Sequence, residues 1–407
     1  MTEGRADETV IVGGGPAGML LAHLLVQGGQ RVHVLERHPD FAREFRGEGI
    51  QVSVVRLLRQ LGLLDELLAA DIARPARAAR VFFDGTEVAT LKGDGDEADF
   101  GIILLQERFL QWLHHRLEGT GLYRATFSAA ADGFELEAGR ATAVRVRDGA
   151  GGRVIAGRAF VVAAGRGTAL RKKLGLTPLP IGTHFNILWM RLQRPADARL
   201  VPDGFRAYLT GDALFILYTA ADGGLQIAWS RRDEVGLGER SFDKKRALLL
   251  HDAPEPLRRY FADAFTEATT TQFLRVQSDR LASWVKHGVL FIGDAAHTMS
   301  PVAGQGINLA MRDAVVAANH ILAARQAGRE LDDELGARLQ AEREPEVRAM
   351  QAFQRRLGYF MLGAPRWQVR AFFKLILPVL GGLGIRRRLL ARVQSGVTRV
   401  RFQLPGS

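Results

Sequence analysis

The chain of 407 residues contains no cysteine. This absence excludes disulfide bonds, thiolate nucleophiles and cysteine-ligated metals, and with them a secreted scaffold held together by disulfides. Residues 347–407 contain no Asp or Glu but carry twelve Lys and Arg side chains, which leaves 43 basic and 44 acidic residues in the rest of the chain. The net charge of +11 therefore belongs to this C-terminal region, and a nucleic-acid partner for the whole protein is not supported.

A signal peptide and a long apolar run are also missing. The first ten residues, MTEGRADETV, carry three acids and no apolar core, so we expect a cytoplasmic protein. The apolar stretch at 372–385 is interrupted by Lys374 and Pro378 and is too short to span a bilayer, and three arginines follow it. Two interpretations of the C-terminal region remain open: a packed helical pair with solvated arginines, or a weak contact with an anionic membrane surface.

The N-terminal segment has the pattern of a dinucleotide-binding unit. Its residues predict a strand at 9–12, a glycine turn at 13–18, a helix at 19–27 and a second strand at 31–36. The turn reads Gly13-x-Gly15-x-x-Gly18, where glycine allows a tight turn and a close approach of the backbone to a pyrophosphate at the helix N-terminus. Glu36 ends the second strand, where a carboxylate can accept hydrogen bonds from ribose hydroxyls. This pattern does not distinguish NAD from FAD.

The remaining sequence predicts an α/β fold with an inserted lobe. Strands at 101–106, 159–164 and 289–292 and helices at 54–68, 107–117 and 307–324 continue the first unit. Short strands at 205–209, 213–218 and 225–229, separated by turn signals, predict an antiparallel sheet. We therefore expect a discontinuous nucleotide-binding domain (1–75, 100–180 and 276–340), a substrate-binding sheet lobe (76–99 and 181–275) and a basic C-terminal helical region (341–407).

A second glycine-rich segment, GDAAHTMSPVAGQGIN at 293–308, indicates which dinucleotide is bound. Asp294 directly follows a strand, where a carboxylate can hold a ribitol or ribose hydroxyl. After Pro301, Gly304 and Gly306 supply bare backbone N–H groups at the start of the next helix. Such groups suit the electron-rich pyrimidine edge of a reduced flavin, and glycine lets the ring lie close to the main chain. The segment therefore favours FAD.

Together these motifs resemble the signature of the p-hydroxybenzoate hydroxylase-like, single-component (class A) FAD-dependent monooxygenases. The resemblance covers roughly residues 8–350 and includes the two glycine segments, Glu36-Arg37, Phe45-Arg46-Gly47, Gln106, Asp313-Ala314 and Glu342-Arg343-x-Pro345. It implies a Rossmann-like FAD-binding domain of the glutathione-reductase type. In such a domain FAD binds extended, with its adenosine on the first segment and its flavin beside the second.

The resemblance also implies the FAD contacts. Asp294 would hold the ribitol side, residues 306–308 the pyrimidine edge, and Arg46 and Gln106 the pyrophosphate. The residues expected to bind the cofactor are Gly13, Gly15, Pro16, Ala17, Gly18, Glu36, Arg37, Arg46, Gln106, Gly165, Asp294, Pro301, Gly304, Gly306, Ile307 and Asn308. No metal site is expected, and no catalytic residue is assigned. His184, Arg206, Tyr208, Tyr218 and Trp229 are polar or aromatic candidates for the substrate side, and His297 is expected to form structural hydrogen bonds.

The implied reaction is hydroxylation of an aromatic or polyketide-like small molecule by a monomer or homodimer. In that family the flavin is reduced by NAD(P)H and reacts with O2 to give a flavin hydroperoxide, which transfers one oxygen atom. One position departs from the family pattern: Ala164-Gly165 stand where the family carries Asp-Gly. The family associates that Asp with FAD and NAD(P)H handling, so nicotinamide use is expected to be weakened or rearranged here.

Two other functions remain open. An FAD-dependent reductase or dehydrogenase of a lipophilic substrate, such as a prenyl chain, shares the fold and would be compatible with Ala164. A flavin-binding protein without redox turnover is disfavoured by the intact segment 304–308. A flavin halogenase is less favoured because the chain lacks a Trp-x-Trp-x-Ile-Pro segment.

Overall fold

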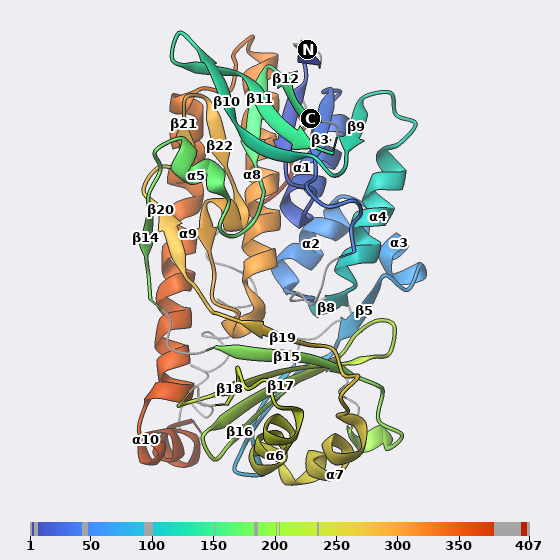
Figure 1. Cartoon of the computed structure of the whole chain (residues 1–407), viewed down its shortest axis with the longest axis vertical. Helices are drawn as coiled ribbons and strands as arrows, with labels where there is room; N and C mark the ends of the chain where they lie inside the picture. Colours follow the sequence, from blue (N-terminus) through green and yellow to red (C-terminus); the bar gives the residue numbers. More distant parts are fainter. Residues whose placement is uncertain are drawn as a thin grey trace.

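The structure is a computed structural model that describes residues 2–3, 7–42, 48–92, 101–149, 151–182, 186–200, 202, 204–233, 236–377 and 400–404. Two lobes follow one another along its longest axis (Figure 1). One lobe, here called the parallel-sheet domain, contains a six-stranded sheet, and the other, the seven-stranded lobe, contains the largest sheet. The fold class expected from the sequence is confirmed.

Five parallel strands form the centre of the parallel-sheet domain. The order is β21 (Val285–Lys286), β22 (Val289–Phe291), β13 (Ala159–Val162), β2 (Thr9–Val12), β3 (Val32–Leu35) and β9 (Tyr123–Thr126), with only β21 antiparallel. Every residue of β2, β3, β13 and β22 is buried. Such continuous apolar strands are typical of parallel sheets that are covered on both faces. The helices α1 (Pro16–Gln27), α4 (Gln106–Leu117) and α8 (Gly306–Gln326) contribute most of their apolar residues to the same core.

Smaller sheets complete this domain. A four-stranded sheet that sequence analysis did not predict contains β1 (Thr2–Glu3), β12 (Gly151–Ala156), β11 (Arg140–Asp148) and β10 (Ala130–Glu137). One three-stranded sheet contains β4 (Gly49–Ile50), β8 (Gly101–Leu104) and β5 (Ala73–Ala76). Another contains β14 (Pro178–Pro180), β20 (Asp279–Leu281) and β23 (His297–Thr298), which begins inside the second glycine segment.

The seven-stranded lobe is almost wholly antiparallel. Its order is β19 (Thr271–Leu274), β15 (Ile187–Leu192), β18 (Leu225–Arg231), β17 (Ala213–Thr219), β16 (Phe205–Thr210), β6 (Ala78–Phe83) and β7 (Thr86–Lys92). The pair β16–β6 is parallel because β6 enters from a distant part of the chain rather than through a hairpin. The helices α6 (Phe242–Asp252) and α7 (Glu255–Ala264) cover one face and form a separate core with it. The other face packs against residues of the parallel-sheet domain and of the C-terminal helices.

Two details differ from the elements expected along the chain. The single helix expected at 54–68 is two helices, α2 (Val52–Gln60) and α3 (Leu64–Ala69), because Gly62 between them has a φ of +70°. The helix α9 (Asp333–Gly358) runs through the predicted domain boundary at 340 and leads to α10 (Arg366–Ala371) beside the seven-stranded lobe (Figure 1). The domain limits drawn from the sequence stay predictions. Among the described residues, no helix is both long and apolar enough to span a bilayer.

Candidate functional site

Each of the three glycines in the first loop occupies its position for a different structural reason. Gly13 has a φ of +113°, and a Cβ there would lie 2.5 Å from the carbonyl oxygen of Ala163. A Cβ on Gly18 would overlap the carbonyl oxygen of Gly13. At Gly15, where φ is −78°, a Cβ would meet no protein atom within 4 Å. Internal contacts therefore explain Gly13 and Gly18, whereas the open space beside Gly15 fits the approach of a pyrophosphate to the backbone.

The N-terminus of α1 adds a positive end to this loop. Gly15 is its N-cap residue and provides no side-chain hydrogen bond, Pro16 follows, and the first turn contains no acid. Ala17 and Gly18 are buried in the same turn. The helix dipole is consequently not neutralised by the first turn itself, which suits an anionic group bound there.

Glu36 lies against the same loop. Its side chain is almost fully buried, and its carboxylate accepts hydrogen bonds from the backbone N–H of Gly14 at 2.7 Å and of His38 at 3.0 Å. The neighbouring Arg37 is exposed and donates from Nε to His38 Nε2 at 3.1 Å. The structure thus brings the carboxylate expected for ribose binding to the glycine turn, whereas Arg37 stays at the surface.

The two glycine-rich segments, which are far apart in sequence, meet in the structure. Gly293 begins the turn η2 (Gly293–Ala295) with a φ of +58°. A Cβ built there would lie 2.9 Å from the Ala310 side chain of α8 and 3.6 Å from the Ala17 side chain of α1. The first turns of α1 and α8 therefore approach each other at a position where only glycine fits. A ligand longer than either loop can contact both segments.

The end of the second segment presents backbone rather than side chains. Pro301 precedes the short turn η3 (Val302–Gly304), in which Ala303 and Gly304 have φ values of +59° and +58°. No side chain caps the N-terminus of α8 at Gln305, and a Cβ on Gly304 would meet no atom within 4 Å. A Cβ on Gly306 would lie 3.8 Å from Asp294 Oδ1, so that carboxylate is close to the first turn of α8.

Asn308 plays a part that the sequence did not predict. Its Nδ2 donates to the carbonyl oxygens of Gly49 at 3.0 Å and Gly304 at 2.8 Å, and its Oδ1 accepts from the N–H of Gln51 at 2.7 Å. The side chain thereby ties β4 and the start of α2 to the second glycine segment. Contact of this residue with a cofactor, as predicted from the sequence, would therefore involve the backbone of α8 rather than this amide.

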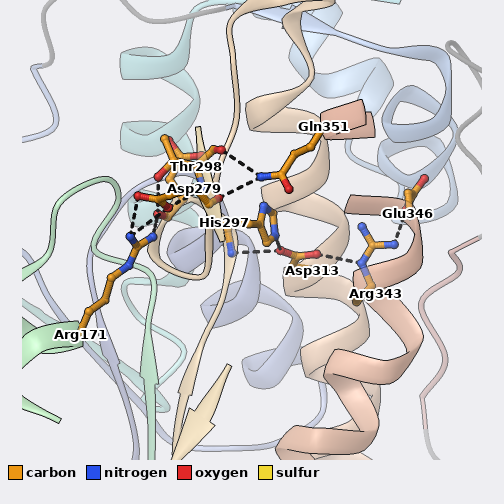
Figure 2. Close-up of polar contacts among 10 residues, drawn as sticks. Arg171, Asp279, His297, Thr298, Asp313, Arg343, Glu346 and Gln351 are labelled. Atoms are coloured by element: carbon orange, nitrogen blue, oxygen red, sulfur yellow. Dashed lines mark hydrogen bonds and ion pairs between the residues drawn. The ribbon is translucent and has the colours of Figure 1, made fainter. Parts of the chain in front are cut away.

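A buried charge network lies behind the second segment (Figure 2). Asp313 accepts from His297 Nε2 at 2.6 Å, from the N–H of Gly293 at 3.0 Å and from Arg343 Nε at 2.8 Å, and Arg343 also pairs with Glu346. Burial alone would raise the pKa of Asp313, but the attractions of His297 and Arg343 outweigh it and lower this pKa to about 2. Asp313 is therefore ionised at neutral pH and fixes the Gly293 backbone. The structural hydrogen bond expected for His297 is present.

Arg171 holds the next part of the same loop from the opposite side (Figure 2). It lies on α5 (Ala169–Lys173) and donates to the carbonyl oxygens of Asp294 and Ala295, each at 2.7 Å. The same guanidinium pairs with Asp279 at 3.0 Å. Because the main-chain carbonyl of Asp294 is fixed in this way, its carboxylate projects from an immobilised backbone.

Two glutamines of α9 hold the segment further along. Gln351 Nε2 donates to the carbonyl oxygen of Thr298 at 3.3 Å, and Gln354 Nε2 donates to those of Ser300 and Val302, each at 2.7 Å. The sequence did not predict these hydrogen bonds, although the spacing of the residues indicates that they lie on the buried face of α9. Arg343, Gln351 and Gln354 fall on the apolar helical face that also carries Val347 and Met350.

The remaining predicted cofactor residues lie in several environments. Gln106 begins α4 and is buried, at 8% exposure. Gly165 has a φ of +74° and open space around it, and the backbone of the preceding Ala164 lies against Gly13. Ile307 is half-buried in the first turn of α8. Arg46 lies outside the described residues.

The substrate-side candidates separate into two groups. Trp229 and Tyr208 belong to the core formed with α6 and α7, where Trp229 Nε1 donates to Asp252 at 3.0 Å. Both point away from the parallel-sheet domain. Tyr218 belongs to the opposite face of the sheet, in a cluster with Ile103 and Val302 of that domain. Arg206 donates to the carbonyl oxygen of Arg199, and His184 lies outside the described residues.

Comparisons with known proteins agree with this geometry. The FAD binding domain family matches residues 7–354. The 6-methylpretetramide 4-monooxygenase of Streptomyces rimosus is 29% identical over 377 residues, which are 89% of this chain and 86% of that protein.

Solved structures show the same fold. The p-nitrophenol 4-monooxygenase PnpA of Pseudomonas putida superposes with a TM-score of 0.82 at 18% identity and covers 97% of this chain and all of its own. The anhydrotetracycline hydroxylase OxyS of Streptomyces rimosus superposes with a TM-score of 0.76 at 23% identity, over 100% of this chain and 78% of its own.

Proposed function

The chain belongs to the FAD binding domain family and is an FAD-dependent monooxygenase, and from that premise we propose that it hydroxylates an aromatic or polyketide-like small molecule. The reductant proposed is NAD(P)H, and the oxygen source is O2. A relative that is 29% identical over most of both chains acts, by its name, on 6-methylpretetramide. That relationship supports the substrate class and leaves the individual substrate open.

The observation that carries the proposal is the meeting of the two glycine segments. Gly15 and Gly304 each have open space where a side chain would stand, and Gly293 allows the helices α1 and α8 to begin side by side. One extended FAD molecule fits such a pair of sites, with its pyrophosphate at α1 and its flavin at α8. FAD supplies the electron transfer and the activation of O2, while the protein positions the substrate and limits access of water.

The residues of this chain then have separate roles in the proposed site. Glu36 accepts hydrogen bonds at the adenosine end, and the carboxylate of Asp294 holds a hydroxyl of the ribityl chain. The N–H groups at the start of α8 stabilise negative charge at the pyrimidine edge. Asp313 and Arg171 do not touch the cofactor in this proposal but hold the loop that does.

The test uses purified FAD-loaded protein with NADH or NADPH and a panel of monocyclic and polycyclic phenols. Oxygen uptake and nicotinamide oxidation should both rise when a suitable phenol is added. A reductase of a lipophilic substrate would instead oxidise NAD(P)H with substrate under anaerobic conditions. Yellow protein that oxidises no nicotinamide with any phenol would contradict the proposal.

The described part of the C-terminal region supports both interpretations of its role. Val369 is fully buried against the seven-stranded lobe, whereas Trp367, Leu375 and Ile376 are exposed, at 70%, 68% and 48%. Exposed apolar side chains beside basic residues such as Lys374 suit an anionic lipid surface. We include weak membrane-surface contact in the proposal. Sedimentation with anionic but not neutral vesicles would support it, and absence of binding to either would favour the packed helical interpretation.

A further inference from the structure

Ala303 has a backbone conformation that residues other than glycine rarely adopt. Its φ is +59° and its ψ is +15°, in the left-handed region, and the next residue, Gly304, has a φ of +58°. Glycine adopts this conformation freely, whereas a Cβ disfavours it roughly 5–30-fold, or by about 1–2 kcal/mol. Such strain persists where the surrounding structure determines the conformation, and it concentrates at functional sites. The surroundings of Ala303 therefore have to explain why it stays left-handed.

Two glutamine side chains fix the peptide groups on either side of Ala303. Gln354 of α9 donates from Nε2 to the carbonyl oxygen of Val302 at 2.7 Å, which fixes the peptide group before Ala303. Gln51, the N-cap residue of α2, donates from Nε2 to the carbonyl oxygen of Ala303 at 3.2 Å, which fixes the peptide group after it. Because φ and ψ are the rotations between these two planar groups, holding both groups determines the conformation of Ala303.

Gln354 makes these contacts although its own hydrogen bonding stays incomplete. Its side chain is 2% exposed, and its Nε2 also donates to the carbonyl oxygen of Ser300 at 2.7 Å, so both amide hydrogens are used. Its Oε1 is buried and has no hydrogen-bond partner among the described residues. An unsatisfied buried acceptor offsets most of the net gain from two hydrogen bonds. The hydrogen bonds of Gln354 therefore contribute little to overall stability and mainly specify the path of the segment.

The clamped residue lies where the chain enters α8. Asn308, in the first turn of that helix, donates to the carbonyl oxygen of Gly304 at 2.8 Å, and its Oδ1 accepts from the N–H of Gln51 at 2.7 Å. Side-chain amides thus hold the consecutive carbonyl groups of residues 302–304. The path of these residues sets where the first N–H groups of α8 point. Those N–H groups are the ones expected to face the pyrimidine edge of a flavin.

We propose that Gln354 and Gln51 are positioning residues, which hold Ala303 in its left-handed conformation and thereby align the N–H groups at the start of α8 with the reduced flavin. The inference deepens the proposed function and rests on it for the identity of the ligand. Loss of either glutamine frees one peptide group, so the strain at Ala303 then favours a relaxed loop. The relaxed loop binds FAD less tightly. The loss is greatest for reduced FAD, because its ring carries the negative charge that the N–H groups stabilise.

The first test measures the FAD affinity of variants by titration of flavin-free protein. Gln354→Met removes both N–H donors with little change in volume and should weaken FAD binding about tenfold, within the range set by the strain at Ala303. Ala303→Gly removes that strain and should bind FAD at least as tightly as the wild type. In the double variant the loop no longer needs the clamp, so its affinity should return to within about threefold of the wild type.

Gln351→Met is the matched control on the same helix. Gln351 donates from Nε2 to the carbonyl oxygens of Asp279 at 2.9 Å and Thr298 at 3.3 Å, so its contacts lie outside the turn that contains Ala303. Its loss should loosen the contact of α9 with the segment, and addition of Ala303→Gly should not restore the FAD affinity. Rescue confined to Gln354→Met separates control of the Ala303 conformation from general support by α9. Circular dichroism and denaturant unfolding verify that each variant folds.

The second test is the two-electron reduction potential of the bound flavin. When the N–H groups are misaligned, reduced FAD should lose about tenfold more affinity than oxidised FAD, which lowers the potential by about 30 mV in Gln354→Met. Gln51→Met should shift the potential in the same direction, because Gln51 holds the other peptide group. A role in stability alone would weaken both oxidation states equally and leave the potential unchanged.

Amide hydrogen exchange of residues 299–306 in flavin-free protein separates this inference from the proposed function. Exchange should quicken in Gln354→Met and slow again when Ala303→Gly is added. Unchanged exchange in Gln354→Met, absence of rescue by Ala303→Gly, or equal rescue of Gln351→Met would each overturn the inference. Protein that shows the expected exchange but binds no FAD would contradict the proposed function and leave the clamp on Ala303 standing. FAD affinity and potential that ignore every substitution would contradict this inference alone.

Discussion

Substitution of Gly15 by alanine should separate cofactor binding from protein stability. Its φ of −78° is accessible to alanine, and the new Cβ would meet no protein atom within 4 Å. Alanine reduces the conformational entropy of the unfolded chain, which stabilises the folded protein by about 0.4–1 kcal/mol, but it is a poorer N-cap residue than glycine by a similar amount. The stability of the flavin-free protein should therefore change by no more than about 1 kcal/mol. The Cβ would instead occupy space needed by the pyrophosphate. Loss of one charge-assisted hydrogen bond costs about 1.5–3 kcal/mol, or roughly 10–150-fold in FAD affinity.

The assay is titration of flavin-free protein with FAD, followed by fluorescence, together with denaturant unfolding. Gly18→Ala is the matched control, because its Cβ would overlap the carbonyl oxygen of Gly13 inside the protein. That variant should unfold far more readily even without FAD. The reasoning is refuted if Gly15→Ala binds FAD as the wild type does, or if it is destabilised as much as Gly18→Ala.

Three further predictions concern the site and its support. Asp313→Asn should destabilise the protein by about 3–5 kcal/mol, because it leaves the buried group of Arg343, Arg312 and Glu346 with one uncompensated positive charge, and FAD release should quicken. Unchanged stability in denaturant unfolding would contradict this. Burial lowers the pKa of His23 to about 4 and of His33 to about 3. Both are neutral when folded, so stability should be full above about pH 6.5 and fall as pH decreases toward 4, and a flat unfolding free energy over this range would count against the burial argument. Ala164→Asp should speed anaerobic flavin reduction by NAD(P)H about tenfold, because it restores one hydrogen bond. Stopped-flow reduction rates equal to those of the wild type would show that this position does not control nicotinamide use.

Local sequence patterns predicted the parts of the site that depend on local backbone geometry. Gly18 is required by a contact within the β-turn-α unit, with the carbonyl oxygen of Gly13, and Gly13 itself adopts a φ of +113° in that turn, so their spacing indicates the turn. The contact of Gly13 with Ala163 comes from a distant strand. The helix expected at 307–324 appears as α8, since its apolar residues recur at helical spacing. The expected helix at 54–68 was wrong in one respect, because Gly62 ends α2 and a glycine inside an apolar pattern does not reveal its φ.

Long-range contacts could not be read from the sequence. The parallel pairing of β6 with β16 joins segments more than a hundred residues apart, and no local pattern specifies such a register. Asn308 was expected at the flavin, but its amide binds Gly49 and Gln51, partners that only the folded chain brings near. The burial that raises the pKa of Glu48 to about 8 likewise had no sequence signal, because it arises only in the folded chain.

The central claim is that this chain transfers an oxygen atom from O2 with the help of bound FAD. The most direct test is turnover of FAD-loaded protein with NAD(P)H, a phenol from the panel that stimulates oxygen uptake, and O2 labelled with heavy oxygen. Mass spectrometry should find one labelled oxygen atom in the product. A product without labelled oxygen, or one formed equally well without O2, would contradict the account.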